Sequence, residues 1–158
     1  MAQGKTLEEP APEGLGGWLI LVGIGIVIAP VRIVVLLVSS YGAVVGSGAW
    51  SVLAAERPWW AAVLVAETVI NVGLIAAWLF GAYLFFSRRR LFRPWYIGLL
   101  AFSLGFLVAD TLVMKLVLPE VPLFDAETVR SFAQGAIAAA IWIPYMLVSR
   151  RAAATFIN

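Results

Sequence analysis

Six polar or charged side chains interrupt long apolar stretches of the sequence, and their types could support chemistry. They are Arg32, Glu67, Asn71, Asp110, Lys115 and Gln134. Two carboxylates can bind a proton or a cation, or act in principle as a general acid and a general base. A charged side chain within a bilayer costs about 2.5–3.5 kcal/mol on insertion scales. Such residues therefore mark either a functional site or a structural group in which charges are paired.

The chain contains neither cysteine nor histidine, which excludes several kinds of site. It cannot form a disulfide, and it has no thiolate or imidazole to ligate zinc, haem or an iron–sulfur cluster. Catalytic triads built on histidine are also excluded. We therefore expect no metal centre and no cofactor, and we expect that the protein is not an enzyme.

The elements that must position these side chains are membrane helices. The sequence is 63% hydrophobic and 13% charged, whereas a soluble domain is about 45–50% apolar and about 25% charged. Its apolar runs predict an all-α, four-helix transmembrane bundle, since about 20 apolar residues span a bilayer. The expected helices are about 18–38, 59–86, 95–118 and 129–149, and Asp125 or Thr128 would cap the last one.

The remaining segments are predicted to lie outside these helices. Residues 1–17 would form a polar cytoplasmic tail and residues 152–158 a short C-terminal tail, flanking a membrane domain of residues 18–151. Residues 39–58 would form an external loop that is partly helical or interfacial. A fifth membrane segment at 39–58 stays open as an alternative.

The distribution of basic residues predicts the orientation of the chain in the membrane. Seven basic residues would lie on one side and only Arg57 and Arg130 on the other; the seven are Lys5, Arg88, Arg89, Arg90, Arg93, Arg150 and Arg151. Because basic residues near membrane ends favour the cytoplasm, both termini are predicted to be cytoplasmic. These arginines flank apolar runs, so we expect them to contact lipid headgroups and we expect no nucleic-acid partner.

The depths of the intramembrane polar residues suggest a common layer. Counted from the cytoplasmic end of its own predicted helix, Arg32 lies about 21 Å deep, and Asn71, Asp110 and Gln134 lie about 22 Å deep. Glu67 would lie one turn further out. Two interpretations stay open for this layer. Arg32 could pair with Glu67 or Asp110 in a structural knot, or the layer could be a site, open to the outer face, for a proton, an ion or a polar ligand.

Three segments resemble one known family. Residues 14–19 read GLGGWL and precede Pro30-x-Arg32, residues 84–90 read LFFSRRR, and residues 140–151 read AIWIPYMLVSRR before Thr155-Phe156. This pattern resembles the bacterial membrane-protein family catalogued as domain of unknown function 2569. The resemblance implies four helices in a bacterial inner membrane. It supplies no activity and no site residues.

These observations favour a small non-enzymatic membrane protein that acts as an accessory, assembly or interaction subunit of a larger complex, or that associates with its own copies. The alternative is a small ion- or proton-coupled transporter that uses Arg32, Glu67 and Asp110. No inverted repeat relates the helix pairs, which counts against the transporter. A membrane enzyme that uses Glu67 and Asp110 as acid and base ranks third.

Overall fold

The computed structural model describes residues 14–117, 119–120, 122 and 125–157 of the chain. Its described residues form helices and no strand. Four helices are long and apolar enough to cross a membrane: α1 (Trp18–Gly46), α3 (Pro58–Phe86), α4 (Phe92–Val117) and α5 (Ala126–Val148). Two short helices complete the fold, α2 (Trp50–Glu56) and α6 (Arg150–Thr155). The prediction of an all-α protein with four membrane helices is confirmed.

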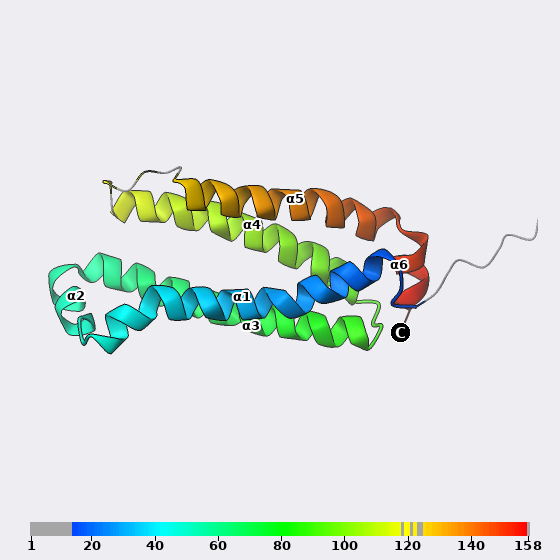
Figure 1. Cartoon of the computed structure of the whole chain (residues 1–158), viewed down its shortest axis with the longest axis horizontal. Helices are drawn as coiled ribbons and strands as arrows, with labels where there is room; N and C mark the ends of the chain where they lie inside the picture. The colour runs from blue at the N-terminus through cyan, green and yellow to red at the C-terminus, as the bar shows by residue number, and fades with distance from the viewer. Residues whose placement is uncertain (1–13, 118, 121, 123–124, 158) are drawn as a thin grey trace, which may run out of the picture.

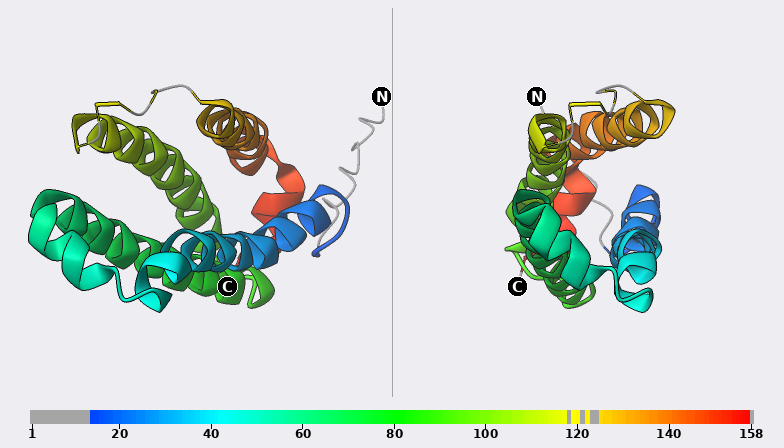
Figure 2. Two further views of the ribbon diagram at one scale, coloured as in Figure 1. Left: turned by 60° about the vertical axis from the view of Figure 1, so that its left-hand side comes forward. Right: turned by 90° about the vertical axis from the view of Figure 1, so that its left-hand side faces the viewer.

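The four long helices form two antiparallel hairpins. α1 packs against α3, and α4 packs against α5. A short turn connects α3 to α4, and these two helices also contact each other (Figure 1). The hairpins meet at the end of the molecule where α6 lies, and they diverge toward the end where α2 lies (Figure 2). We call these the closed end and the open end.

The hydrophobic core lies at the closed end. Phe85 and Phe92 are almost fully buried, and their ring centroids are 5.1 Å apart in an edge-on arrangement. Phe156, from the C-terminal segment, packs against Phe92 in a tilted arrangement with centroids 4.4 Å apart. Leu19 and Met146 add buried side chains from α1 and α5. Aromatic contacts of this kind add to the burial of apolar area, so this cluster joins the two hairpins.

The segment 39–58 was predicted to be an external loop that is partly helical or interfacial; it does contain a helix, Trp50–Glu56, but residues 39–46 continue α1. α1 continues to Gly46 because Ser39 does not interrupt it; the Ser39 hydroxyl donates to the Val35 carbonyl at 2.7 Å and so stays within the helix. The chain turns at Gly48, whose φ of +69° suits glycine. It then forms α2, and Pro58 opens α3 at a position where its missing N–H has no cost.

The C-terminal segment also differs from the predicted tail. Ser149 caps α6 by accepting a hydrogen bond from the Ala152 N–H at 3.2 Å. Thr155 and Phe156 are buried. The Thr155 hydroxyl accepts from the Gly14 N–H at 3.1 Å and lies 3.3 Å from the Gly14 carbonyl, to which it donates. The segment therefore folds back and ties the residues that precede α1 to the closed end.

Asp125 is the N-cap of α5, and Thr128 is not. The Thr128 N–H donates to Asp125 Oδ1 at 2.6 Å. These hydrogen bonds hold the pKa of the exposed Asp125 carboxyl below its ordinary value, because they stabilise the charged form.

Candidate functional site

The core-facing stripe of α3 changes character along the helix. Phe85, Trp78 and Leu74 are buried at helical spacings of seven and four residues. The same stripe continues toward the open end as Asn71 and Glu67, which are half-buried. Asn71 Nδ2 donates to the Glu67 carbonyl at 3.0 Å, so the amide is engaged within its own helix. The Glu67 carboxylate therefore continues the inward-facing side of α3.

α4 shows the same change along its length. Phe92, Tyr96 and Leu99 are buried, and the stripe continues with Ser103 and Asp110, which are half-buried. The Ser103 hydroxyl oxygen is buried and has no hydrogen-bond partner in the described part of the chain. The two hairpins thus present apolar faces to each other at the closed end and polar faces toward the open end.

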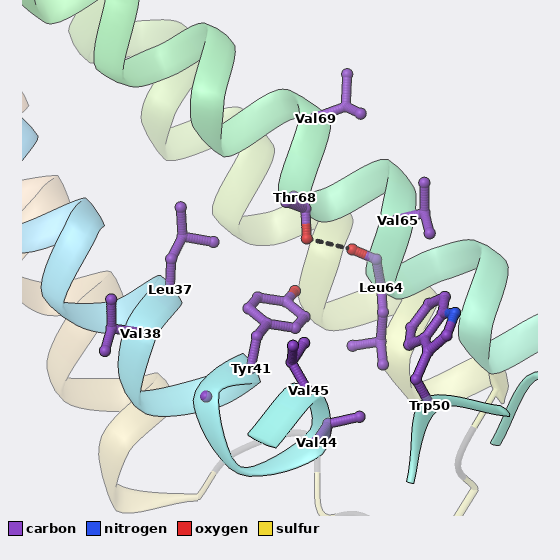
Figure 3. A pocket seen from close by; sticks show the side chains of 11 residues that line it. Leu37, Val38, Tyr41, Val44, Val45, Trp50, Leu64, Val65, Thr68 and Val69 are labelled. Carbon is purple, nitrogen blue, oxygen red and sulfur yellow. Dashed lines mark hydrogen bonds between the residues drawn. The ribbon is translucent and has the colours of Figure 1, made fainter. Parts of the chain in front are cut away.

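The third polar group comes from α1. The Tyr41 hydroxyl is buried and interacts with the side chains of Glu67 and Thr68 across the α1–α3 interface, although no described atom completes a hydrogen bond of good geometry with it. Thr68 instead donates to the Leu64 carbonyl at 2.7 Å (Figure 3). Tyr41 was not among the sequence candidates, because the helix was expected to end at residue 38. Its spacing of four residues after Leu37 was the signal that could have identified it.

A cavity of about 660 Å³ adjoins this group between α1, α2 and α3 (Figure 3). Valine and leucine side chains form most of its wall. Tyr41 and Thr68 contribute polar side chains, and Trp50 lines it from α2. The cavity therefore lies between the lipid-facing surface and the polar side chains at the open end.

Glu67 and Asp110 form the charged part of the site. The two carboxyl groups are close enough to interact electrostatically, and no basic side chain of the described residues forms an ion pair with either. The described residues also hold no group of three or more carboxylates that could bind a metal ion. Two carboxylates that repel each other in a medium of low dielectric favour a proton, a small cation or a cationic group beside them.

Arg32 does not join the carboxylates, contrary to the expectation that it would pair with Glu67 or Asp110. It is exposed and forms no ion pair with any carboxylate that the structure describes. Tyr41 is the α1 residue beside Glu67, and Arg32 lies nine residues earlier, about 14 Å along the axis. The predicted common layer is corrected accordingly.

The cause of this error is the register of α1. The depth count assumed that Trp18 and Phe86 lie at the same level. A Cβ placed on Gly23 would instead lie 3.0 Å from the Phe85 ring, so Gly23 is the residue level with that part of α3. α1 therefore begins about four residues, or about 6 Å, further toward the closed end than predicted, which brings Arg32 nearer to that end.

Gln134 also lies apart from the carboxylates. It is exposed on α5, and the neighbouring Gly135 packs on Leu104, where an added Cβ would lie 3.3 Å from the leucine side chain. Leu104 precedes Asp110 on α4 by six residues, about 9 Å. Of the sequence candidates, the structure brings Glu67, Asn71 and Asp110 onto facing stripes and leaves Arg32 and Gln134 outside them.

The arginines at the closed end divide into two groups. Arg88, Arg89, Arg90 and Arg150 are exposed. Arg93 instead reaches from α4 to the end of α5, where Nε and Nη2 donate to the Met146 carbonyl at 2.9 and 2.6 Å. Nη2 also donates to the Leu147 carbonyl at 3.2 Å. The last carbonyls of a helix lack an N–H donor from the helix itself, so Arg93 acts as a C-terminal cap for α5.

The Arg151 side chain covers the glycines that precede α1. A Cβ on Gly16 or Gly17 would lie 2.9 or 2.8 Å from Arg151 Nη1. Trp18 meets Trp142 with ring centroids 6.3 Å apart, and Phe85 meets Phe156 at 5.7 Å. The three segments that carry the sequence resemblance therefore touch one another at the closed end.

Comparison with known protein families places nearly the whole chain in one family model. A family model described as "Protein of unknown function (DUF2569)" matches residues 12–157. No curated protein and no solved structure matches the chain significantly.

Proposed function

The chain belongs to the DUF2569 family of proteins of unknown function, and on this basis we propose that it is a multi-pass protein of the bacterial inner membrane with both termini in the cytoplasm. The turn at residues 87–91 and helix α6 lie at the same end of the molecule (Figure 1), and both are rich in arginine. Arg57 and Arg130 belong to segments at the open end. This asymmetry supports a cytoplasmic closed end.

Cysteine substitution tests the orientation, because the native chain has no cysteine. We expect Asp125→Cys, at the open end, to react with an impermeant thiol reagent in intact cells. Arg90→Cys should react only after the membrane is permeabilised. Labelling of Arg90→Cys without labelling of Asp125→Cys in intact cells would reverse the assignment.

We propose further that the protein is a non-enzymatic accessory or assembly subunit that associates laterally with another membrane protein. The observation that carries this proposal is the incomplete burial of its helices. In an apolar stretch of 18 residues within α4, only 6% is buried inside the chain, and the same is true of α5. The inward stripes of the open end nevertheless bear the half-buried carboxyl groups of Glu67 and Asp110.

The cost of these polar groups favours a protein partner over lipid at the open end. Ionised carboxylates that face hydrocarbon are costly. A transmembrane helix of a partner can provide polar groups and close packing at the same time, and these two interactions drive helix association in bilayers.

A photoreactive amino acid placed at Ser103 tests this association in native membranes. We expect irradiation to produce an adduct with another protein chain. The matched control is the same amino acid at Ala101, which is exposed, lies at nearly the same depth and projects from the opposite side of α4. Adducts with lipid alone at both positions would contradict the proposal.

A second candidate function, ion- or proton-coupled transport, is favoured by the Glu67–Asp110 pair. The two carboxylates interact without a described basic partner, as a binding site for a cation or a proton requires. Arg32, which the sequence placed in this site, has no part in the revised candidate.

Reconstituted vesicles separate the two functions. A transporter should move protons or an alkali cation down an imposed gradient, and Glu67→Gln with Asp110→Asn should abolish the flux without loss of folded protein. An accessory subunit should show no flux above that of empty vesicles. In that case the same double substitution should weaken the protein adduct at Ser103.

A further inference from the structure

A second apolar cavity, of about 640 Å³, lies as a groove between α3 and α4. Small residues form its floor: Gly73 and Ala77 from α3 and Gly98 from α4. A Cβ added at Gly73 or at Gly98 would meet no described atom within 4 Å beyond its neighbouring residues and the backbone of its own helix. The small residues therefore leave space between the two helices on this face.

One wall of the groove is fixed in place by Trp95. Its indole Nε1 donates to the Ala77 carbonyl at 3.1 Å, and its ring meets Phe80 with centroids 5.0 Å apart. Phe80 in turn stacks on Tyr83 at 6.1 Å. An aromatic series thus leads from the groove toward the end of α3, and because Trp95 is held at both its nitrogen and its ring, the groove is formed in advance.

A basic pocket of about 450 Å³ adjoins the groove at the closed end. Tyr83, Leu84, Arg89, Arg90 and Leu91 line it. Leu91 lines the groove as well, so the pocket and the groove are adjacent. Arg89 and Arg90 are exposed, and neither side chain has an interaction partner within the described residues. The pocket therefore offers two guanidinium groups and no acidic side chain of its own.

The length of the groove matches one leaflet of a bilayer. Along α4 its lining runs from Leu91 to Phe102, eleven residues and about 16 Å. The hydrocarbon core of a bilayer is about 30 Å thick, so one leaflet contributes about half of that. A ligand with a headgroup at Arg89 and Arg90 and an apolar chain of leaflet length would fill both spaces.

We propose that the basic pocket and the groove together bind one anionic phospholipid from the leaflet that the turn at residues 87–91 faces. Its phosphate lies against Arg89 and Arg90, whose planar guanidinium groups suit phosphate oxygens. One acyl chain lies over Gly73 and Gly98. This site is separate from the open end, so it is independent of the proposed accessory role. Basic pockets at helix ends are a recurrent mode of anionic lipid recognition.

Native mass spectrometry of the detergent-solubilised protein tests the headgroup contact. The probes are phosphatidylglycerol and phosphatidylcholine with identical acyl chains. We expect phosphatidylglycerol to bind more tightly, and Arg89→Gln and Arg90→Gln each to lower its affinity about fivefold. Arg150→Gln, an exposed arginine of α6 outside the pocket, is the charge-matched control and should change the affinity less than twofold. Equal binding of the two lipids would overturn the proposal.

The groove is tested by Gly98→Leu, because an added Cβ at Gly98 meets open space within the groove and the rest of the leucine side chain would occupy it. We expect this variant to keep the thermal stability of the native protein and to lose most of its phosphatidylglycerol binding. Gly25→Leu is the matched control, because an added Cβ at Gly25 on α1 also meets open space, and this variant should bind phosphatidylglycerol normally. Equal binding by the two variants would overturn the acyl-chain site. Displacement of the lipid by millimolar glycerol phosphate would show a site for soluble phosphates and would also overturn it.

Discussion

Replacing Arg93 with alanine separates a structural role of this arginine from a role in headgroup contact. Arg93 donates to the carbonyls of Met146 and Leu147, at 2.6 Å and 3.2 Å from Nη2. A hydrogen bond from a charged donor contributes about 1.5–3 kcal/mol to the free energy of unfolding. A cation at a helix C-terminus adds about 0.3–1 kcal/mol. Because one of the two hydrogen bonds is exposed, we take the lower value for each, and Arg93→Ala should lower the free energy of unfolding by about 3 kcal/mol.

The assay is equilibrium unfolding in mixed micelles with increasing denaturing detergent, followed by helix content. Arg90→Ala is the matched control, since Arg90 is exposed in the same turn and should change stability by less than about 0.5 kcal/mol. Arg93→Lys should recover only part of the loss, because an ammonium group lacks the fork that reaches both carbonyls. Equal destabilisation by Arg93→Ala and Arg90→Ala would refute the capping argument.

Three further predictions concern other parts of the fold. Phe92→Ala should lower the unfolding free energy by about 3–5 kcal/mol, whereas Phe102→Ala, at a side chain that is 55% exposed, should change it little in the same assay. Thr155→Val removes both bonds to Gly14 and should cost about 1–2 kcal/mol, with faster amide exchange at Gly14; unchanged exchange would contradict the contact. Asp125→Ala should remove an acid-sensitive part of α5 helicity. The folded pKa of Asp125 lies below its unfolded value of about 3.9, so this contribution is complete above about pH 5 and disappears as the pH falls through the folded pKa. Circular dichroism against pH measures it, and an identical acid profile in the variant would show that the cap is unimportant.

Much of the architecture follows from local sequence patterns. The four apolar runs identify the four membrane helices, because a stretch of about 20 apolar residues is stable in lipid whatever its neighbours are. Asp125 was one of two candidates for the cap of α5, since an acidic residue before the first turn can accept an exposed N–H. That Glu67 and Asn71 lie on the same face of α3 follows from their spacing of four residues.

Other features depend on contacts between helices. The extension of α1 to Gly46 requires α3 beside it, and the moderate hydropathy of residues 39–46 did not reveal this contact. Arg93 was predicted to contact lipid headgroups, like the neighbouring arginines. Its hydrogen-bond acceptors, the Met146 and Leu147 carbonyls, come from the end of α5, whose position only the tertiary structure shows. α6 has no apolar stripe of its own, and it is held by Phe156 and Thr155, which are buried at the closed end.

The candidate site shows the same division between what composition specifies and what packing specifies. Residue types and spacing predict that Glu67 and Asp110 lie within membrane helices, since solvation in lipid acts on each segment separately; that they lie on the inward-facing sides of α3 and α4 is seen only in the structure. Their proximity to Tyr41 and their separation from Arg32 depend on the axial register of α1 against α3. That register is set where Gly23 accommodates the Phe85 ring, and such a fit between side chains of distant segments leaves no trace in the hydropathy of either one.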